Sequence, residues 1–356
     1  MAKRLLTGNE AAVFGALMGG CTHFFGYPIT PASEIAQSAA TYFLASGRTF
    51  LQAESEVSAI NMVYGAASSG SKAMTASSGP GIALMGEGLS YLAGSRLPAV
   101  IIDMQRAGPG LGNIWPEQSD YNMVVKGGGH GNYSNIVLTP ATVQEMYDFT
   151  KKAFDLAQKY RMSVFILADG YIGQMMEAVE IKLPLLKNER QSWALYGDKE
   201  SRNNLITSIY MTTESQSNHN KLLLETYKKV EEELVDYEAI NIEDASVVFV
   251  AYGIASRITY SAVRQLRERG YKVGLLRLKA VFPFPKKIIK EISDAKKRLI
   301  VVELSSGQMA DDVVLASGNL EVERFLTFGG IMPKVEDLIQ FVTEGERYGK
   351  YKAGSF

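Results

Sequence analysis

Two carboxylates, Glu54 and Glu56, lie where a predicted strand gives way to a predicted helix, in the stretch "FLQAESEVSAINMVYGAASSG". An acidic side chain at a helix N-terminus is often a cap that interacts with the helix dipole, and the spacing alone favours that interpretation. A catalytic acid is the alternative. The residues after Glu56 are almost uncharged, so a carboxyl group that packs among them would be desolvated and could share a proton with a heterocyclic nitrogen.

A second turn, "TASSGPGIALMGEG", places Ser78 and Gly79 between a predicted strand and a predicted helix. Small residues let backbone N–H groups approach a ligand closely, and they equally let a neighbouring segment pack closely. The turn matches neither the dinucleotide fingerprint nor the phosphate-binding P-loop. From its residues alone, it is as consistent with packing as with ligand binding.

Arg106 follows the predicted strand "AVIIDMQ" and precedes a loop rich in glycine and proline. Its guanidinium could bind a carboxylate with two parallel hydrogen bonds, or it could form a structural salt bridge at the base of the loop. Further along, "KGGGHGNY" gives His130 a flexible setting unlike that of a core histidine. No cysteine or acidic residue lies nearby at metal-ligand spacing, so no metal site is predicted.

The stretch "GYPITPASEI" ends another predicted strand with a corner that holds two prolines and the hydroxyl of Thr30. A strand that only had to turn could use Asn-Gly or Asp-Gly at little cost. We therefore expect this corner to hold a ligand.

The elements that must position these side chains alternate between strand and helix over residues 1–185. The predicted strands are "THFFGYP", "TFLQA", "KAMTAS", "AVIIDMQ", "NIVLTP" and "SVFILAD". Their apolar runs are continuous, which implies burial on both faces and hence a parallel sheet with helices on either side. The fold class is therefore α/β.

The rhythm breaks over residues 186–244, which are polar and turn-rich and include a predicted charged helix, "KLLLETYKKVEEELVDYEAI". We interpret this stretch as a linker with a helical arm. A second series of strands and helices, with "SVVFVAYG", "YKVGLLRLK" and "KRLIVVEL" as strands, predicts a smaller α/β domain over residues 245–356.

Composition limits the classes of function. The chain has 37 basic and 38 acidic residues among 356, so it lacks the basic surface expected of a nucleic-acid-binding protein. No apolar run approaches the length of a membrane span, and the N-terminus does not resemble a signal peptide, so we expect a cytoplasmic protein. The single cysteine, Cys21, allows neither a disulfide nor a cysteine-ligated iron–sulfur cluster within this chain.

Several segments together resemble the alpha-type subunit of 2-oxoacid:ferredoxin oxidoreductases. They are "GNEAAVFGALMGGCTHFFGYPITPASEI", "LQAESEVSAINMVYGAASSG", "QRAGPGLG", "KGGGHG" and "ILADGYIGQMME". The second domain is similar to the family's transketolase C-terminal-like domain and carries its "LKAVFPFP" segment. Within the family, the 2-oxoisovalerate (3-methyl-2-oxobutanoate) type is the most similar, and the 2-oxoglutarate type is the close alternative.

The resemblance implies that residues 1–185 form the pyrimidine-binding module for thiamine diphosphate. It implies that Glu56 contacts the aminopyrimidine ring, that Thr30 bonds the oxygen atoms of the substrate, and that Arg106 meets the carboxylate of the 2-oxoacid. The other cofactor-binding residues expected on this basis are Tyr27, Pro28, Ile29, Ser78 and Gly79. The implied reaction is the coenzyme A-dependent oxidative decarboxylation of a 2-oxoacid to acyl-CoA and CO2, with reduction of ferredoxin.

The family's Gly-Asp-Gly motif with a downstream Asn, which holds the diphosphate and Mg2+, does not occur in this sequence. The resemblance therefore implies a beta subunit that supplies the diphosphate and Mg2+ site. It implies that iron–sulfur clusters lie on other subunits, with gamma and ferredoxin-like delta subunits as candidates. Two alternatives stay open: a noncatalytic assembly subunit that kept the fold, and a nucleotide- or coenzyme A-binding module that acts alone.

Overall fold

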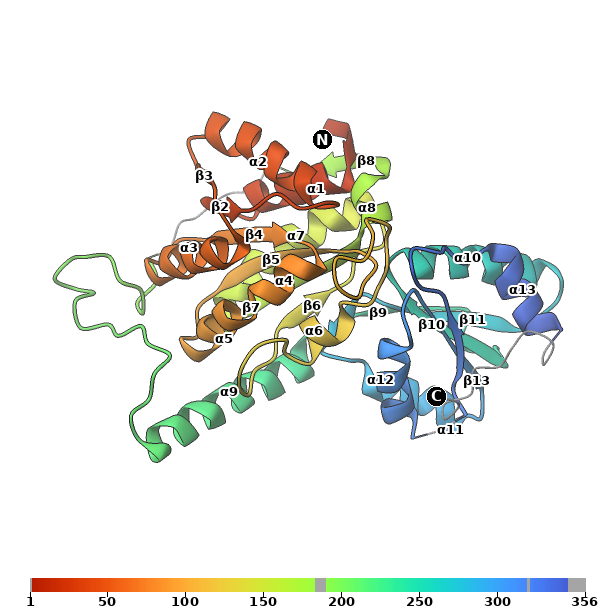
Figure 1. Cartoon of the computed structure of the whole chain (residues 1–356). Coiled ribbons are helices and arrows are strands. Elements are labelled where there is room, and N and C mark those ends of the chain that lie inside the picture. The colour runs from red at the N-terminus through yellow and green to blue at the C-terminus, as the bar shows by residue number, and fades with distance from the viewer. Residues whose placement is uncertain (1, 183–189, 319–320, 345–356) are drawn as a thin grey trace.

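The computed structural model describes residues 2–182, 190–318 and 321–344, and its larger part is a seven-stranded sheet (Figure 1). In spatial order the strands are β12 (Ala280–Phe282), β6 (Ile136–Leu138), β7 (Ser163–Asp169), β5 (Ala99–Gln105), β4 (Ala73–Ser77), β2 (His23–Gly26) and β3 (Thr49–Gln52). Neighbouring strands of this sheet are parallel, except that the edge strand β12 is antiparallel to β6.

Helices cover both faces of this sheet (Figure 1). One face carries α1 (Gly8–Met18), α2 (Ser33–Ala45) and α7 (Val143–Tyr160). The other carries α3 (Glu56–Ser68), α4 (Gly79–Leu84) and α5 (Gly86–Gly94). Every residue of β5 and β7 is buried, as expected for central strands that pack against helices on both sides.

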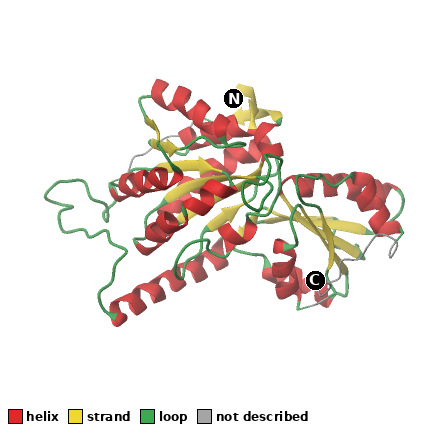
Figure 2. Cartoon of the chain, viewed as in Figure 1, coloured by secondary structure: helices red, strands yellow, loops and turns green. Residues whose placement is uncertain are grey.

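A five-stranded sheet forms the smaller part of the molecule. In spatial order its strands are β14 (Glu323–Leu326), β13 (Arg298–Glu303), β10 (Val247–Tyr252), β11 (Val273–Leu278) and β9 (Tyr237–Ile240). Its helices are α10 (Gly253–Glu268) and α13 (Val335–Thr343), which pack together, and α11 (Lys286–Asp294) and α12 (Gln308–Ser317), which also pack together. Figure 2 shows a group of loops between the two parts.

The parallel α/β fold predicted from the sequence is confirmed, but several strands were not predicted. Strand β1 (Ala2–Thr7) pairs with β8 (Met176–Ile181) in a separate two-stranded ribbon. Strand β12 belongs to the second part of the chain in sequence, but it pairs with β6 of the seven-stranded sheet. Next to this pairing, the hydroxyl of Thr139 donates a hydrogen bond to the carbonyl of Leu278 over 2.8 Å.

The charged helix predicted over residues 221–240 has different ends. Helix α9 spans Thr213–Glu233, and its N-terminus is capped by Thr212. Residues 237–240 form β9 instead, because they pair with β11 and because the carbonyl of Asp236 accepts hydrogen bonds from Lys279 and Ala280 over 3.1 and 3.0 Å. Tertiary pairing thus overrides the local helical pattern.

Two smaller features bear on function. The thiol of Cys21 is buried, and burial raises its pKa to about 12, so it acts as a small core side chain rather than a reactive group. Over the described ranges, no helix is both long enough and apolar enough to cross a membrane.

Candidate active site

The residues singled out in the sequence gather at one edge of the seven-stranded sheet. The Tyr27–Thr30 corner follows β2, Ser78 and Gly79 follow β4, and Arg106 follows β5. These three strands are neighbours and parallel, so their carboxyl ends meet at the same edge, where ligands bind in open α/β sheets.

Arg106 and Thr30 are in direct contact. One terminal nitrogen of the guanidinium, Nη1, donates to the carbonyl of Thr30 over 3.0 Å, and the other, Nη2, donates to the carbonyl of Leu111 over 3.1 Å. The corner itself is held from beneath by Asn9, whose Nδ2 donates to the carbonyl of Pro31 over 3.0 Å. Tyr27, Pro28 and Thr30 are exposed.

The guanidinium of Arg106 keeps donors available. It forms no ion pair with any carboxylate in the described part of the chain, and two of its five N–H groups are used by the carbonyls of Thr30 and Leu111. The structural salt bridge that the sequence left open is therefore not formed. The guanidinium lines a cavity of about 500 Å³, together with Gly79, Gly108 and Asp120.

Glu56 and Glu54 occupy different environments. Helix α3 is capped by the hydroxyl of Ser55, which accepts from the backbone N–H of Ser58 over 3.2 Å. Glu54 is exposed and accepts from the hydroxyl of Ser58 over 2.5 Å. Glu56 is buried, with 5% of its surface exposed, and its carboxylate forms no hydrogen bond with the described residues. Glu56 is therefore not needed as a cap.

The turn that follows β4 lies against this carboxylate. A Cβ atom added to Gly81 would stand 2.6 Å from the Oε1 atom of Glu56 and 2.1 Å from the hydroxyl oxygen of Ser77, so a larger residue there would have to displace these side chains. The hydroxyls of Thr75, Ser77 and Ser78 are buried, and they have no hydrogen-bond partner among the residues that the structure describes. Buried polar groups normally have partners, so this turn is lined with groups that could bind a ligand.

Three carboxylates near the cavity were not identified from the sequence. Asp103 is fully buried in β5, opposite Ser77 of β4. Glu117 is buried and accepts hydrogen bonds from the backbone of Gly108 and of Gly329, over 3.1 and 2.5 Å. Asp120 lies on the cavity wall. The one available signal was Asp103, a charge within an otherwise apolar predicted strand.

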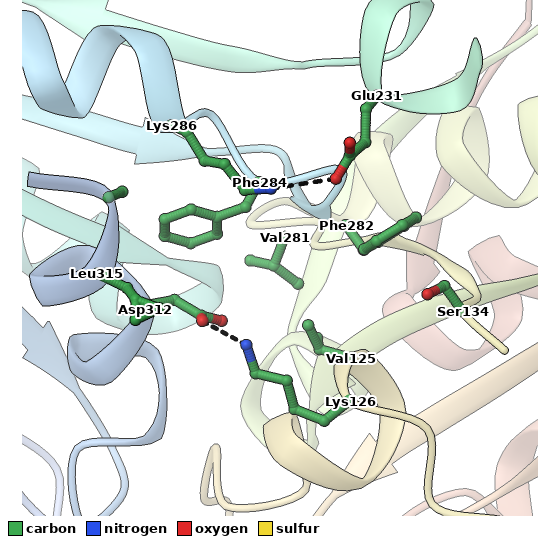
Figure 3. A pocket seen from close by; sticks show the side chains of 11 residues that line it. Val125, Lys126, Ser134, Glu231, Val281, Phe282, Phe284, Lys286, Asp312 and Leu315 are labelled. Carbon is green, nitrogen blue, oxygen red and sulfur yellow. Dashed lines mark hydrogen bonds and ion pairs between the residues drawn. The ribbon is translucent and has the colours of Figure 1, made fainter. Parts of the chain in front are cut away.

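A second cavity, of about 400 Å³, lies between the two parts of the molecule (Figure 3). Val125, Phe282 and Phe284 form part of its apolar lining. Two ion pairs border it, one between Lys126 and Asp312 and one between Lys286 and Glu231 at 3.1 Å. Each of these two lysines is thus paired with a carboxylate. Arg106, at the first cavity, forms no ion pair in the described part of the chain.

Comparison with known families gives two consecutive matches. Residues 14–239 match the family described as "Pyruvate flavodoxin/ferredoxin oxidoreductase, thiamine diP-bdg". Residues 245–338 match "Pyruvate:ferredoxin oxidoreductase core domain II".

The chain is also similar to individual proteins over nearly its whole length. It is 51% identical over 345 residues to "Ketoisovalerate oxidoreductase subunit VorB" of Methanothermobacter thermautotrophicus, covering 97% of this chain and 98% of the relative. It is 37% identical over 339 residues to "2-oxoglutarate synthase subunit KorA" of Methanocaldococcus jannaschii, covering 88% of this chain and 91% of the relative.

Two solved structures are similar to the fold. A 2-oxoglutarate:ferredoxin oxidoreductase from Magnetococcus marinus, with 2-oxoglutarate, coenzyme A and succinyl-CoA bound, superimposes with a TM-score of 0.87 at 26% identity, over 96% of this chain and 65% of that chain. A split-gene transketolase, an inactive beta4 tetramer, superimposes with a TM-score of 0.56 at 12% identity, over 95% of this chain and 96% of that chain, a likeness of fold alone.

Proposed function

This chain belongs to the 2-oxoacid:ferredoxin oxidoreductase family as a thiamine diphosphate-binding, alpha-type subunit, and we propose that it helps catalyse the coenzyme A-dependent oxidative decarboxylation of a 2-oxoacid. The products are acyl-CoA, CO2 and reduced ferredoxin. The observation that carries the proposal is the convergence of Glu56, Thr30 and Arg106 at one sheet edge, with Arg106 bonded to the backbone of Thr30.

The preferred substrate is proposed to be a branched-chain 2-oxoacid of the 2-oxoisovalerate type. The support is the 51% identity to a relative named for ketoisovalerate, against 37% to a relative named for 2-oxoglutarate. 2-Oxoglutarate is the alternative substrate.

The residues beside Glu56 fit the pyrimidine half of thiamine diphosphate. A buried carboxylate without a partner, a glycine that leaves room beside it and buried hydroxyls without partners together suit a ring that offers both a donor and an acceptor. When bound, thiamine diphosphate supplies the carbon nucleophile and the electron sink for decarboxylation. We assign its pyrimidine ring to Tyr27, Pro28, Ile29, Glu56, Ser78 and Gly79.

In this proposal each side chain has one task. Glu56 exchanges a proton with the pyrimidine ring, because its buried carboxyl group forms no hydrogen bond with the described residues and can face the ring. Arg106 binds the 2-oxoacid carboxylate with the N–H groups that the carbonyls of Thr30 and Leu111 leave over. Thr30, which Arg106 holds through its backbone, bonds the substrate oxygens.

The remaining parts of the enzyme are proposed to lie on partner subunits. A beta subunit supplies the diphosphate and Mg2+ site, and iron–sulfur clusters lie on other subunits that pass electrons to ferredoxin. The support is the absence of a Gly-Asp-Gly motif and the single cysteine in this sequence. We propose that residues 1–185 form the pyrimidine-binding domain, residues 186–244 the linker with its helical arm, and residues 245–356 the smaller α/β domain.

The proposal is tested on the purified complex, loaded with thiamine diphosphate, by coenzyme A-dependent dye reduction with 2-oxoisovalerate, 2-oxoglutarate and pyruvate in turn. We expect the highest kcat/KM with 2-oxoisovalerate. A complex that assembles but turns over none of these acids would support a noncatalytic assembly subunit. The preserved Glu56, Thr30 and Arg106 argue against that alternative.

Arg106→Ala is expected to raise the KM for the 2-oxoacid about tenfold or more, with a much smaller effect on the KM for coenzyme A. Losing a hydrogen bond to a charged group costs roughly 1.5 to 3 kcal/mol, and an arginine that clamps a carboxylate mainly supplies binding. Steady-state kinetics with each substrate varied in turn gives both constants. Equal changes in both would indicate that Arg106 only holds the loop.

Gly81→Ala is expected to lower kcat about tenfold. The added methyl group must displace the Glu56 carboxylate, which would lie 2.6 Å from it, and a misplacement of about 1 Å can cost roughly 100-fold. Gly65→Ala is the matched control, because it lies in α3 with nothing within 4 Å of the added Cβ. Equal kcat values for the two variants would contradict the proposed position of Glu56.

A further inference from the structure

Asp120 lies on the wall of the cavity that Arg106 also lines. Its Oδ2 atom is shielded from solvent and has no hydrogen-bond partner among the described residues. A Cβ atom on Gly79 would stand 2.6 Å from its Oδ1 atom, so the carboxyl group sits directly against the turn that follows β4. Asp120, Gly79 and Arg106 therefore line the same cavity.

The surroundings of Asp120 favour its neutral form. Burial, and then the charge of Glu117, raise the pKa of Asp120 to about 7, although the charge of Arg106 lowers it. Beneath it, Asp103 is fully buried with both carboxyl oxygens unpartnered among the described residues. Burial, and then the charge of Asp120, raise the pKa of Asp103 well above its usual range.

The titratable and charged groups that face Asp120 come from three elements. Asp103 and Arg106 come from β5 and the residue after it, Glu117 comes from the same loop, and Tyr252 comes from the end of β10. Arg106 is the only cation among these four described groups. It lines the same cavity as the carboxyl groups of Asp120 and Glu117. The protonation of Asp120 therefore decides how much positive charge the cavity presents.

We propose that Asp120 is a substrate-binding residue whose neutral form admits the 2-oxoacid carboxylate beside Arg106 and whose ionised form opposes it. This inference rests on the function proposed above. When protonated, Asp120 donates a hydrogen bond into the cavity and leaves Glu117 as the remaining carboxylate that offsets the charge of Arg106 there. When ionised, it repels the carboxylate and partly neutralises Arg106. The burial of Asp103 likewise opposes its ionisation.

The sign of the pH dependence follows. Because Asp120 is neutral below its pKa and charged above it, the KM for the 2-oxoacid should be low near pH 6 and rise about tenfold by pH 8 in the complex, if the ionised form hardly binds. The KM for coenzyme A serves as an internal reference. Asp120→Asn keeps a neutral donor, so its KM for the 2-oxoacid should stay low across the range. Asp103→Asn imitates the protonated acid and should keep the wild-type profile.

A second measurement is independent of turnover. Infrared spectra of the isolated full chain, taken as the difference between wild type and Asp120→Asn, should contain a carboxylic acid band that titrates near pH 7, with melting temperatures recorded for both. Burial also raises the pKa of Glu303 to about 7, but Glu303 is common to both chains and cancels in the difference. The inference is overturned if this band is absent from the difference, or if Asp120→Asn retains the rise in KM. A complex that turns over no 2-oxoacid would instead overturn the proposed function, and the infrared titration would still decide the state of Asp120.

Discussion

Turnover by the assembled complex is expected to fall by at least about 100-fold in Glu56→Gln, because general acid–base groups typically contribute about 10²- to 10⁴-fold. Glutamine keeps the volume and much of the hydrogen bonding but cannot exchange the proton. Glu56 is buried, and its carboxylate forms no ion pair or hydrogen bond with the described residues, so we expect the fold and the assembly to survive the change.

The measurement is proton exchange at C2 of bound thiamine diphosphate, followed by NMR together with the melting temperature. Glu54→Gln is the matched control, because Glu54 is two residues away, exposed and bonded to Ser58. We expect it to leave the exchange rate unchanged. If the Glu56→Gln complex exchanges at the wild-type rate, Glu56 takes no part in proton transfer.

The second large effect concerns the chain by itself. Without its partners, the purified chain is expected to show no turnover and to bind thiamine diphosphate poorly. The sequence has no Gly-Asp-Gly motif, and the described ranges contain no group of three or more His, Cys, Asp or Glu side chains that could hold a metal ion. Under the proposed division of the active site, the charged diphosphate half of the cofactor is therefore anchored by the beta subunit rather than by the described part of this chain.

Calorimetric titration with thiamine diphosphate and Mg2+, with and without the beta subunit, measures this directly, and dye reduction measures turnover. Binding should become strong when the beta subunit is added. Turnover of a 2-oxoacid by the single chain would contradict the proposed division of the active site between subunits.

The central strands could be predicted from the sequence because burial on both faces leaves a continuous apolar run, as in β5 and β7. Two short edge strands, β9 and β12, could not. Strand β9 has alternating half-buried and exposed residues within a charged stretch, and the pairing of β12 depends on β6, which lies far earlier in the chain. Such pairings are decided by tertiary contacts rather than by local propensity.

The candidate site divides in the same way. The contact between Arg106 and Thr30 could be expected because each follows a strand in a recognisable motif, and parallel strands bring such residues to one edge. Asp120 was missed because its loop is polar in sequence, and its shielding arises from Gly79 and Glu117, which pack around it only in the folded chain.

The pairing of β12 with β6 limits where the chain can be cut into separate fragments. Because β12 covers the outer edge of β6, a fragment that ends at residue 244 would leave that edge open, with unpaired N–H and C=O groups in a row. Open edges of this kind template pairing with other chains and promote aggregation. We therefore expect a fragment of residues 1–244 to aggregate unless a substitute for β12 is supplied. We also expect that a proteolytic cut between residues 240 and 280 need not separate the two parts, because β12 stays paired with β6.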